Sequence, residues 1–414
     1  MRARYFTLAG ILAASGAAAL SACATHVDEF LAEPAPEVVV PAPEAEAGAD
    51  AAAPFDASDA APCADCEYFP EVCTDDVLCQ NGLFGTDGGL DPRAQVNVIR
   101  GRSASDVWIA GALGALAHFD GVSWTPSDLG VRETVHALWL DDSGEVSAAS
   151  LQRLFSRGLD DPNDAGVSDG GWTSRTTRTP SAEYRRWSRT LVSGWSFPGS
   201  EWRWGVTTNH CASSTCLVSD PSPTSGVWRF RSSPVAPGSF DIADVISKNM
   251  CARISCGDMM SIHGSSANDL WAVGNGGAAV RITEAESNAP TILAFNTQTL
   301  STLHGVWAAS ESEAWAVGAQ GLVRHYSGHP VLWDIVSDVP TNEDLFAVWG
   351  SSPSDVWVVG DAATVLHYDG VTWSRVKIAS LGARRPKLTA VWVPSPGHVW
   401  IGGQGVLLSL GGKP

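Results

Sequence analysis

Residues 345–360 read LFAVWGSSPSDVWVVG, two short apolar runs separated by a polar turn. The runs Leu345–Trp349 and Val356–Val359 are rich in β-branched and aromatic residues, which favours strands. Ser, Pro and Ser at 352–354 favour a tight turn between them. Two more strand-like runs follow across an Asp-Gly turn, at Val365–Tyr368 and Thr372–Val376. The segment therefore predicts four short antiparallel strands in succession.

This unit recurs along the chain. The copies centre on seven positions: Val107, Val146, Trp202, Leu270, Ala314, Val356 and Val399. The last four centres are 42–44 residues apart, which is the size of one four-stranded blade of a β-propeller. A single such sheet cannot bury both faces, but sheets stacked around an axis can. We therefore expect an all-β, seven-bladed propeller over 93–414, with the repeat tryptophans filling the space between neighbouring sheets.

The final copy is incomplete, because only four residues follow Val406–Leu410. An outer strand is missing there, and an unpaired sheet edge is a liability. We expect a strand from before the first repeat, within Leu83–Pro92, to close the ring. This N-terminal strand would also bring the cysteine-rich segment 63–92 against the propeller wall.

The repeats resemble those of large bacterial extracellular propeller proteins, of the form A-V-W-G-S-S-x-S-D-V-W-A-V-G followed by H-Y-D-G-x-x-W. They are more distantly similar to photosystem assembly-factor and Asp-box propellers. The resemblance covers 96–412 and implies the fold, but not an activity, because propellers host many functions. His118 and His367 stand where the Asp-box has Ser or Thr. We expect His118–Gly121 and His367–Gly370 to form tight turns between third and fourth strands.

The N-terminus has the anatomy of a secretory signal over residues 1–22. Arg2 and Arg4 precede an apolar run, Tyr5–Leu20, that is too short for a comfortable membrane span. Leu20-Ser21-Ala22-Cys23 resembles the lipobox of bacterial lipoproteins, which implies that Cys23 becomes the lipidated N-terminus. The residue after it is Ala24, so we expect an outer-membrane lipoprotein, facing the periplasm or the cell surface. The alternative is an ordinary signal peptide, with Cys23 a spare thiol.

Charge is concentrated between the signal and the repeats. The formal net charge is −19, and residues 24–62 contain nine Asp or Glu and no Lys or Arg. Together with abundant Ala and Pro, this composition predicts that 23–62 is a disordered, extended linker. The repeat region is nearly balanced and has no basic patch, so we expect no nucleic-acid partner.

Nine cysteines are present, and removing Cys23 leaves an even number. They form two groups: Cys63, Cys66, Cys73 and Cys79 before the repeats, and Cys211, Cys216, Cys251 and Cys256 within them. The first group begins as C-x-x-C, so zinc is an alternative, but export favours disulfides. The sequence leaves their connectivity open.

No catalytic motif stands out, and we expect neither an enzyme nor a cofactor. His118, His325 and His367 recur at one position of separate blades, so they cannot converge on one metal ion. The segment Asp161–Asp169 faintly resembles a calcium loop but lacks ligand-type residues at key positions, including the closing Glu. We therefore expect no metal site.

Insertions in the third unit are the predicted binding face. We expect the segments 209–216 and 231–258 to form loops on one face, each carrying a cysteine pair that is either locally closed or bridged to the other. The candidate binding residues are Tyr184, Arg185, Arg186, Trp187, His210, Lys248 and Arg253. The sequence favours a module that binds a protein or glycan. Two alternatives are an assembly factor for envelope proteins, and a glycan hydrolase or lyase with acidic residues such as Glu201 and Asp361 near the central channel.

Overall fold

The computed structural model describes residues 65–412 apart from 86–88, 143, 160–165, 179–188 and 210–224. The chain divides into Met1–Ala60 and Ala61–Pro414, and the description concerns the second unit. The signal peptide, Cys23, the linker 23–62 and Cys63 lie outside the described residues. No helix among the described residues is long and apolar enough to cross a membrane.

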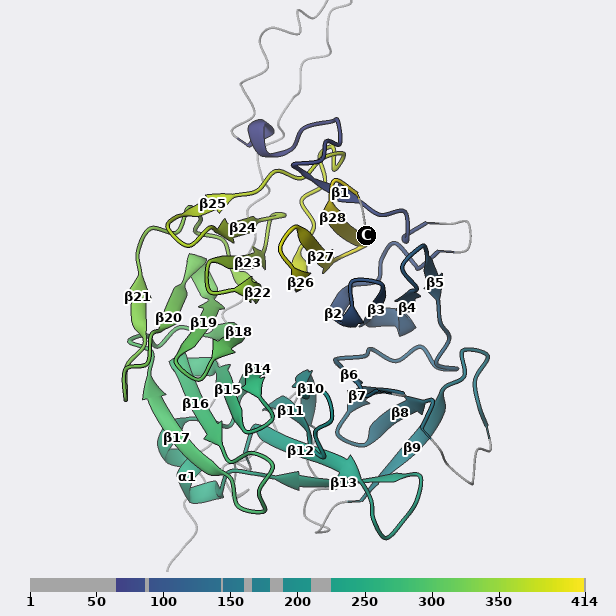
Figure 1. The fold of residues 1–414 in the computed structure, drawn as a ribbon, viewed down its shortest axis with the longest axis vertical. Coiled ribbons are helices and arrows are strands. Elements are labelled where there is room, and N and C mark those ends of the chain that lie inside the picture. Colours follow the sequence, from purple (N-terminus) through teal and green to yellow (C-terminus); the bar gives the residue numbers. More distant parts are fainter. Residues whose placement is uncertain are drawn as a thin grey trace, which may run out of the picture. The chain divides into compact units, whose positions relative to one another are not determined.

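Nearly all regular structure is β-strand, arranged in sheets around a central axis (Figure 1). Five four-stranded sheets have these strands: β2 (Val96–Ser103), β3 (Asp106–Gly111), β4 (Leu116–Phe119), β5 (Trp124–Pro126); β14 (Met259–Ser266), β15 (Asp269–Gly274), β16 (Ala278–Thr283), β17 (Thr291–Asn296); β18 (Leu303–Ser310), β19 (Glu313–Gly318), β20 (Val323–Tyr326), β21 (Asp334–Val336); β22 (Leu345–Ser352), β23 (Asp355–Gly360), β24 (Val365–Tyr368), β25 (Trp373–Arg375); and β1 (Leu78–Gln80), β28 (Val406–Leu410), β27 (His398–Gly403), β26 (Leu388–Ser395).

The remaining strands form one eight-stranded sheet: β6 (Ala137–Leu140), β7 (Glu145–Ser150), β8 (Arg153–Arg157), β9 (Thr173–Arg178), β13 (Ser239–Asp244), β12 (Val227–Ser232), β11 (Arg203–Asn209) and β10 (Arg189–Trp195). Its two halves have the same four-stranded order as the other sheets. They are joined where the outer strands β9 and β13 pair in parallel. The strand order thus makes seven four-stranded units, and the expected all-β propeller is confirmed.

Helical elements are few and short. They are η1 (Cys66–Tyr68), η2 (Ala112–Gly114), η4 (Asn275–Gly277), η5 (Ala319–Gly321) and α1 (Lys248–Ile254). The turns η2, η4 and η5 recur between the second and third strands of their units. The helix α1 lies between β13 and β14, in the connection from the third unit to the fourth.

The ring is closed by β1, which pairs antiparallel with β28 at the edge of the last unit. A closing strand from the N-terminal side was expected, but its predicted place within Leu83–Pro92 was wrong. Leu78 holds β1 in place, because its side chain is fully buried and its backbone N–H donates to the carbonyl of Lys377. Leu83 and Leu90 instead pack between the last unit and the first.

Two disulfides are present in the described residues, Cys73–Cys79 and Cys251–Cys256. Cys66 is also disulfide-bonded. The first bridge ties Cys73 to Cys79 in β1, which pairs with β28, so the cysteine-rich segment does lie against the propeller wall. The second closes locally at the end of α1, which rules out a bridge from this pair to Cys211 or Cys216. Those two cysteines lie outside the described residues.

Tryptophans fill the seams between neighbouring units, as expected from the repeat. The second-strand tryptophan of one unit meets an aromatic ring of the next edge-to-face, at centroid distances of 4.9–5.7 Å. The pairs are Trp271–Trp333, Trp400–Trp124, Trp315–Trp373 and Trp108–Trp172. Because each sheet buries its apolar face on its neighbour, the seams hold the ring together.

Closer to the axis, tryptophans of the innermost strands lie against glycines of the following unit. A Cβ at Gly350 would lie 2.6 Å from Cη2 of Trp307 and 2.7 Å from the carbonyl oxygen of Asp355. The same contact recurs in two other seams, Trp195 on Gly264 and Trp392 on Gly101, at 2.5 and 2.4 Å. Only glycine leaves room for an indole so close to the backbone.

Replacing Gly350 with Ala should therefore destabilise the fold, because the new methyl group overlaps both Trp307 and backbone. We expect a loss of about 1–3 kcal/mol in the free energy of unfolding, measured by denaturant titration. Gly82→Ala is the matched control, since a Cβ there meets nothing within 4 Å. Equal stability of the two variants would contradict the seam contact.

Candidate functional site

The predicted insertion face is not assembled by the described residues. Tyr184, Arg185, Arg186, Trp187 and His210 lie outside them. Lys248 begins α1, and Arg253 is exposed in its last turn. The segment 231–258 is also not a single loop, because it contains β13, the outer strand of the third unit. That strand is needed to cover β12, so the interpretation of 231–258 as an insertion was wrong.

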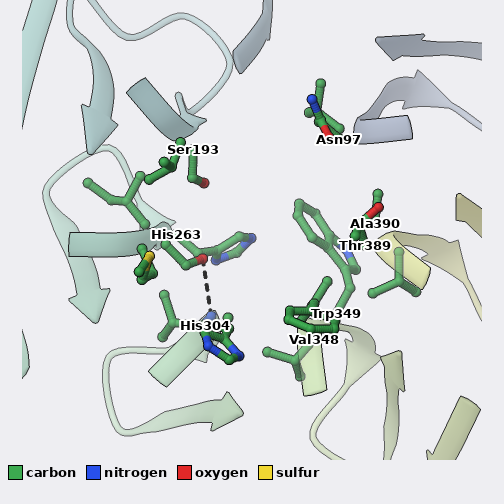
Figure 2. A pocket seen from close by; sticks show the side chains of 18 of the residues that line it. Asn97, Ser193, His263, His304, Val348, Trp349, Thr389 and Ala390 are labelled. Carbon is green, nitrogen blue, oxygen red and sulfur yellow. Dashed lines mark hydrogen bonds between the residues drawn. The ribbon is translucent and has the colours of Figure 1, made fainter. Parts of the chain in front are cut away.

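Three side chains instead converge on the central axis, and each departs from the seam arrangement. Arg100, His263 and Trp349 pair across the sheet with the second-strand tryptophan of their own unit. This is the register of Trp307 and Trp392, which lie on glycine. All three line a central cavity instead. Figure 2 shows His263 and Trp349 in this cavity.

These three side chains do not pack in a seam because the following unit lacks the glycine that receives the indole in the other seams. The residue at that register is Ala308 after His263, Val393 after Trp349, and Trp139 after Arg100. A side chain at these positions occupies the space that an indole needs in the seam. The sequence signal was therefore present as the missing glycines at Trp139, Ala308 and Val393, but only the register revealed its consequence.

The guanidinium of Arg100 spans the channel. Its Nη2 donates to the carbonyl of Gly194 at 3.1 Å, and its Nη1 to that of Ile99 at 2.8 Å. The group also lies 4.8 Å from the ring centroid of Trp349, a cation–π contact. Burial lowers the pKa of Arg100 to about 10, so the side chain is still a cation at neutral pH.

Two histidines that line the same cavity, His263 and His136, differ from Arg100 in carrying no charge at neutral pH. The Nδ1 atom of His263 accepts a hydrogen bond from the N–H of Ala308 at 3.1 Å, and its ring meets Trp349 edge-to-face at 4.6 Å. Burial, with a smaller contribution from Arg100, moves its pKa well below the ordinary value. Burial also lowers the pKa of His136. These two imidazoles are neutral at pH 7, so neither adds a positive charge beside Arg100.

The cavity has a volume of about 100 Å³ and is lined from all seven units. Its walls come from the innermost strands of six units and from His136, which precedes β6 in the second unit. Side chains on these strands hydrogen-bond to backbone of the next unit, which satisfies groups that no ladder pairs. The donors and acceptors are Asn97–Val135, Ser261–Val306, His304–Leu345 and Thr389–Val96.

Acidic residues are absent from the lining of this cavity among the described residues. Glu201 pairs with Arg231 at 2.8 Å on the surface, and Asp361 lies in the turn between β23 and β24. Neither belongs to the cavity. The carboxylate pair that a glycan hydrolase needs, roughly 5–10 Å apart, is therefore not provided by these two residues at this site.

Acid–base pairs recur at the other end of the units. The Nε2 atom of His118 lies 2.8 Å from Asp106, that of His325 2.6 Å from Glu313, and that of His367 2.7 Å from Asp355. Each imidazole also packs on the tryptophan two residues after its acid. The three histidines thus lie in three different units and do not converge on one site.

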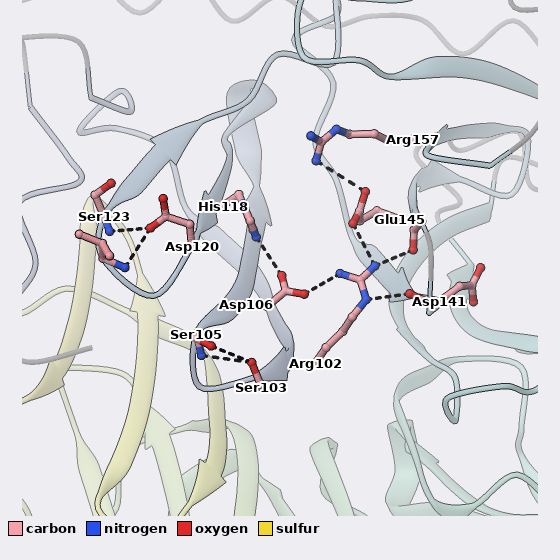
Figure 3. Close-up of polar contacts among 12 residues, drawn as sticks. Arg102, Ser103, Ser105, Asp106, His118, Asp120, Ser123, Asp141, Glu145 and Arg157 are labelled. Atoms are coloured by element: carbon pink, nitrogen blue, oxygen red, sulfur yellow. Dashed lines mark hydrogen bonds and ion pairs between the residues drawn. The ribbon is translucent and has the colours of Figure 1, made fainter.

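Arg102 extends this arrangement across a seam (Figure 3). Its guanidinium donates to Asp106 and Glu145 at 2.9 Å each, linking the first and second units. The turns after the third strands have the predicted form: Asp120 accepts the N–H groups of Val122 and Ser123. These contacts explain the S-x-S-D-x-W and H-x-D-G motifs as structural.

Asp355 is the best-connected of these acids. Burial opposes its ionisation, but hydrogen bonds from Ser351, His367 and the indole N–H of Trp357 outweigh it. The pKa of Asp355 is therefore lower than the ordinary value for an aspartate.

Comparisons with known proteins support the fold alone. No protein-family model and no curated protein sequence matches the chain. Among solved structures, it is similar to YCF48 from Cyanidioschyzon merolae, with 13% identity, a TM-score of 0.56, and 81% of this chain and 98% of that chain covered. A YCF48 described as bound to D1 peptide has 14% identity and a TM-score of 0.56, over 83% and 97% of the chains. A streptogramin B lyase has 13% identity and a TM-score of 0.56, over 80% and 97%. These neighbours are β-propellers of different activities.

Asp355→Asn should lower stability at neutral pH by about 1–3 kcal/mol, because charged hydrogen bonds are lost. Folding lowers this pKa, so the carboxylate stabilises the native state above its unfolded pKa of about 4. The contribution is lost as pH falls through the lower native value. The gap between wild type and variant should thus shrink below about pH 4 in urea titrations. Asp338→Asn, at an exposed site, is the control; a gap independent of pH would contradict this account.

Proposed function

We propose that this protein is a lipid-anchored binding protein of the bacterial envelope, which takes part of its ligand into the central cavity. The observation that supports this most is Arg100, a cation inside a cavity whose described lining contains no carboxylate. Buried charges without a counter-charge are costly and mark sites of function. The ring of sheets supplies a rigid frame around this cavity.

A protein ligand is favoured over a neutral glycan, because a neutral sugar would leave the charge of Arg100 unused. The propeller YCF48 is described as bound to a peptide, which supports the reading as an assembly or docking factor. A lyase among the structural neighbours keeps an enzyme as the second candidate. The absence of Asp and Glu from the described cavity lining argues against acid–base hydrolysis there.

The anchor is a separate part of the proposal, since it depends on Leu20–Cys23. Growth with labelled palmitate should label the wild-type chain and not a Cys23→Ser variant, which should leave the membrane fraction. Equal labelling, or a variant still in the membrane fraction, would favour an ordinary signal peptide and another mode of attachment.

Binding is tested by affinity capture from an envelope extract with the full mature chain as bait. Ser193→Phe places a ring in the cavity, so partners identified with the wild type should be lost. Ser374→Phe, on the exposed strand β25, is the matched control and should keep them. Circular dichroism checks that both variants are folded. Partners retained by Ser193→Phe would overturn the cavity as the binding site.

A further inference from the structure

We infer that the central cavity binds a free carboxylate group at the guanidinium of Arg100, carried on a chain narrow enough to enter the channel. The inference rests on the proposed binding function and names the chemistry of its ligand. It follows from three features of the described residues: the charge of Arg100 without a carboxylate in the cavity lining, the side chains next to it and the size of the cavity.

The guanidinium of Arg100 makes fewer hydrogen bonds than that of Arg324. Arg324, which is buried, donates from Nε, Nη1 and Nη2 to three backbone carbonyls, those of Thr297, Val323 and Gln298. Arg100 donates to two, and its Nε has no such acceptor among the described residues. Guanidinium groups present donors in a fork that fits a carboxylate with two parallel bonds.

Two other arginines have a carboxylate partner. Arg102 pairs with Asp106, and Arg281 with Asp269 at 2.5 Å. These pairs lie where the second strands of their units begin, whereas Arg100 lies on the axis against Trp349. The positive charge is therefore uncompensated where a ligand can reach it, and an anion there would relieve the cost of burial.

The neighbours of Arg100 favour one anion class. His263 is neutral, and its Nδ1 is occupied by the N–H of Ala308, so the ring adds no second charge for a phosphate. The hydroxyl of Ser193 and the face of Trp349 also line the cavity. One cation beside an aromatic wall fits a monoanionic carboxylate with a short apolar stem.

The size of the cavity limits what carries that carboxylate. Its volume of about 100 Å³ is below the roughly 300 Å³ at which pockets for compact ligands begin. A carboxylate with two or three carbon atoms fits, as at the C-terminal end of an extended peptide or in a short aliphatic acid. A uronic acid does not, because its ring would have to enter as well.

The test is a titration of the full mature chain, followed by tryptophan fluorescence at constant ionic strength, because Trp349 lies at the site. Propionate should give a saturable change and propionamide should not. Arg100→Gln should weaken propionate binding about tenfold or more, since it removes the charge. Arg100→Lys should keep part of the affinity, and Arg324→Gln should keep all of it.

Further arms identify the source of the carboxylate. Triglycine with a free C-terminus, binding more tightly than propionate while its amide does not bind, would assign a peptide end. Propionate binding without triglycine binding would assign a small acid. Equal binding of propionamide, unchanged affinity in both Arg100 variants, or glucuronate competing as well as propionate would overturn the inference.

The outcomes separate this inference from the proposed function. If carboxylates fail to bind while Ser193→Phe still loses its envelope partners, the cavity binds a ligand of another class. If carboxylates bind Arg100 but the partners are kept by Ser193→Phe, the subsite exists and the partner docks elsewhere. If neither holds, both proposals are wrong. Near-UV circular dichroism of each Arg100 variant excludes misfolding as the cause of a loss.

Discussion

The contact of an innermost-strand tryptophan with a glycine of the following unit sets how the sheets meet near the axis. Trp307 on Gly350 is one of three such seams, and in each the glycine has no room for a Cβ. An indole buried there removes a large apolar surface from water while it keeps the neighbouring backbones close. The outer parts of the seams, with their edge-to-face tryptophan pairs, extend the same packing outward.

The candidate site arises where this contact is missing. Arg100, His263 and Trp349 have the same cross-strand register as the packed tryptophans, but the next unit offers Trp139, Ala308 or Val393 instead of glycine. Their side chains turn to the axis and meet one another, at 4.8 Å for Arg100 with Trp349 and 4.6 Å for His263 with Trp349. Where the glycine is missing, the repeat thereby leaves a cavity that contains the guanidinium of Arg100.

Much of the fold could be predicted from the sequence, because the repeat carries its own strands, turns and tryptophans. The closing strand was expected, but not its position at Leu78–Gln80, because three residues have no periodicity to reveal a strand. The cavity could not be predicted, since Arg100 and His263 resemble ordinary degraded repeat positions until sheets from opposite sides of the ring are brought together. The long insertions led to the predicted binding face, whereas the cavity is built by single substitutions within the repeat.

The most direct measurement is the crystal structure of a Val393→Gly variant beside that of the wild-type chain. The account predicts that the glycine opens the seam between β22 and β26, so that the indole of Trp349 moves into it and leaves Arg100 without its aromatic partner. If Trp349 instead stays over the guanidinium of Arg100 in the variant, the missing glycine is not what directs these side chains to the axis.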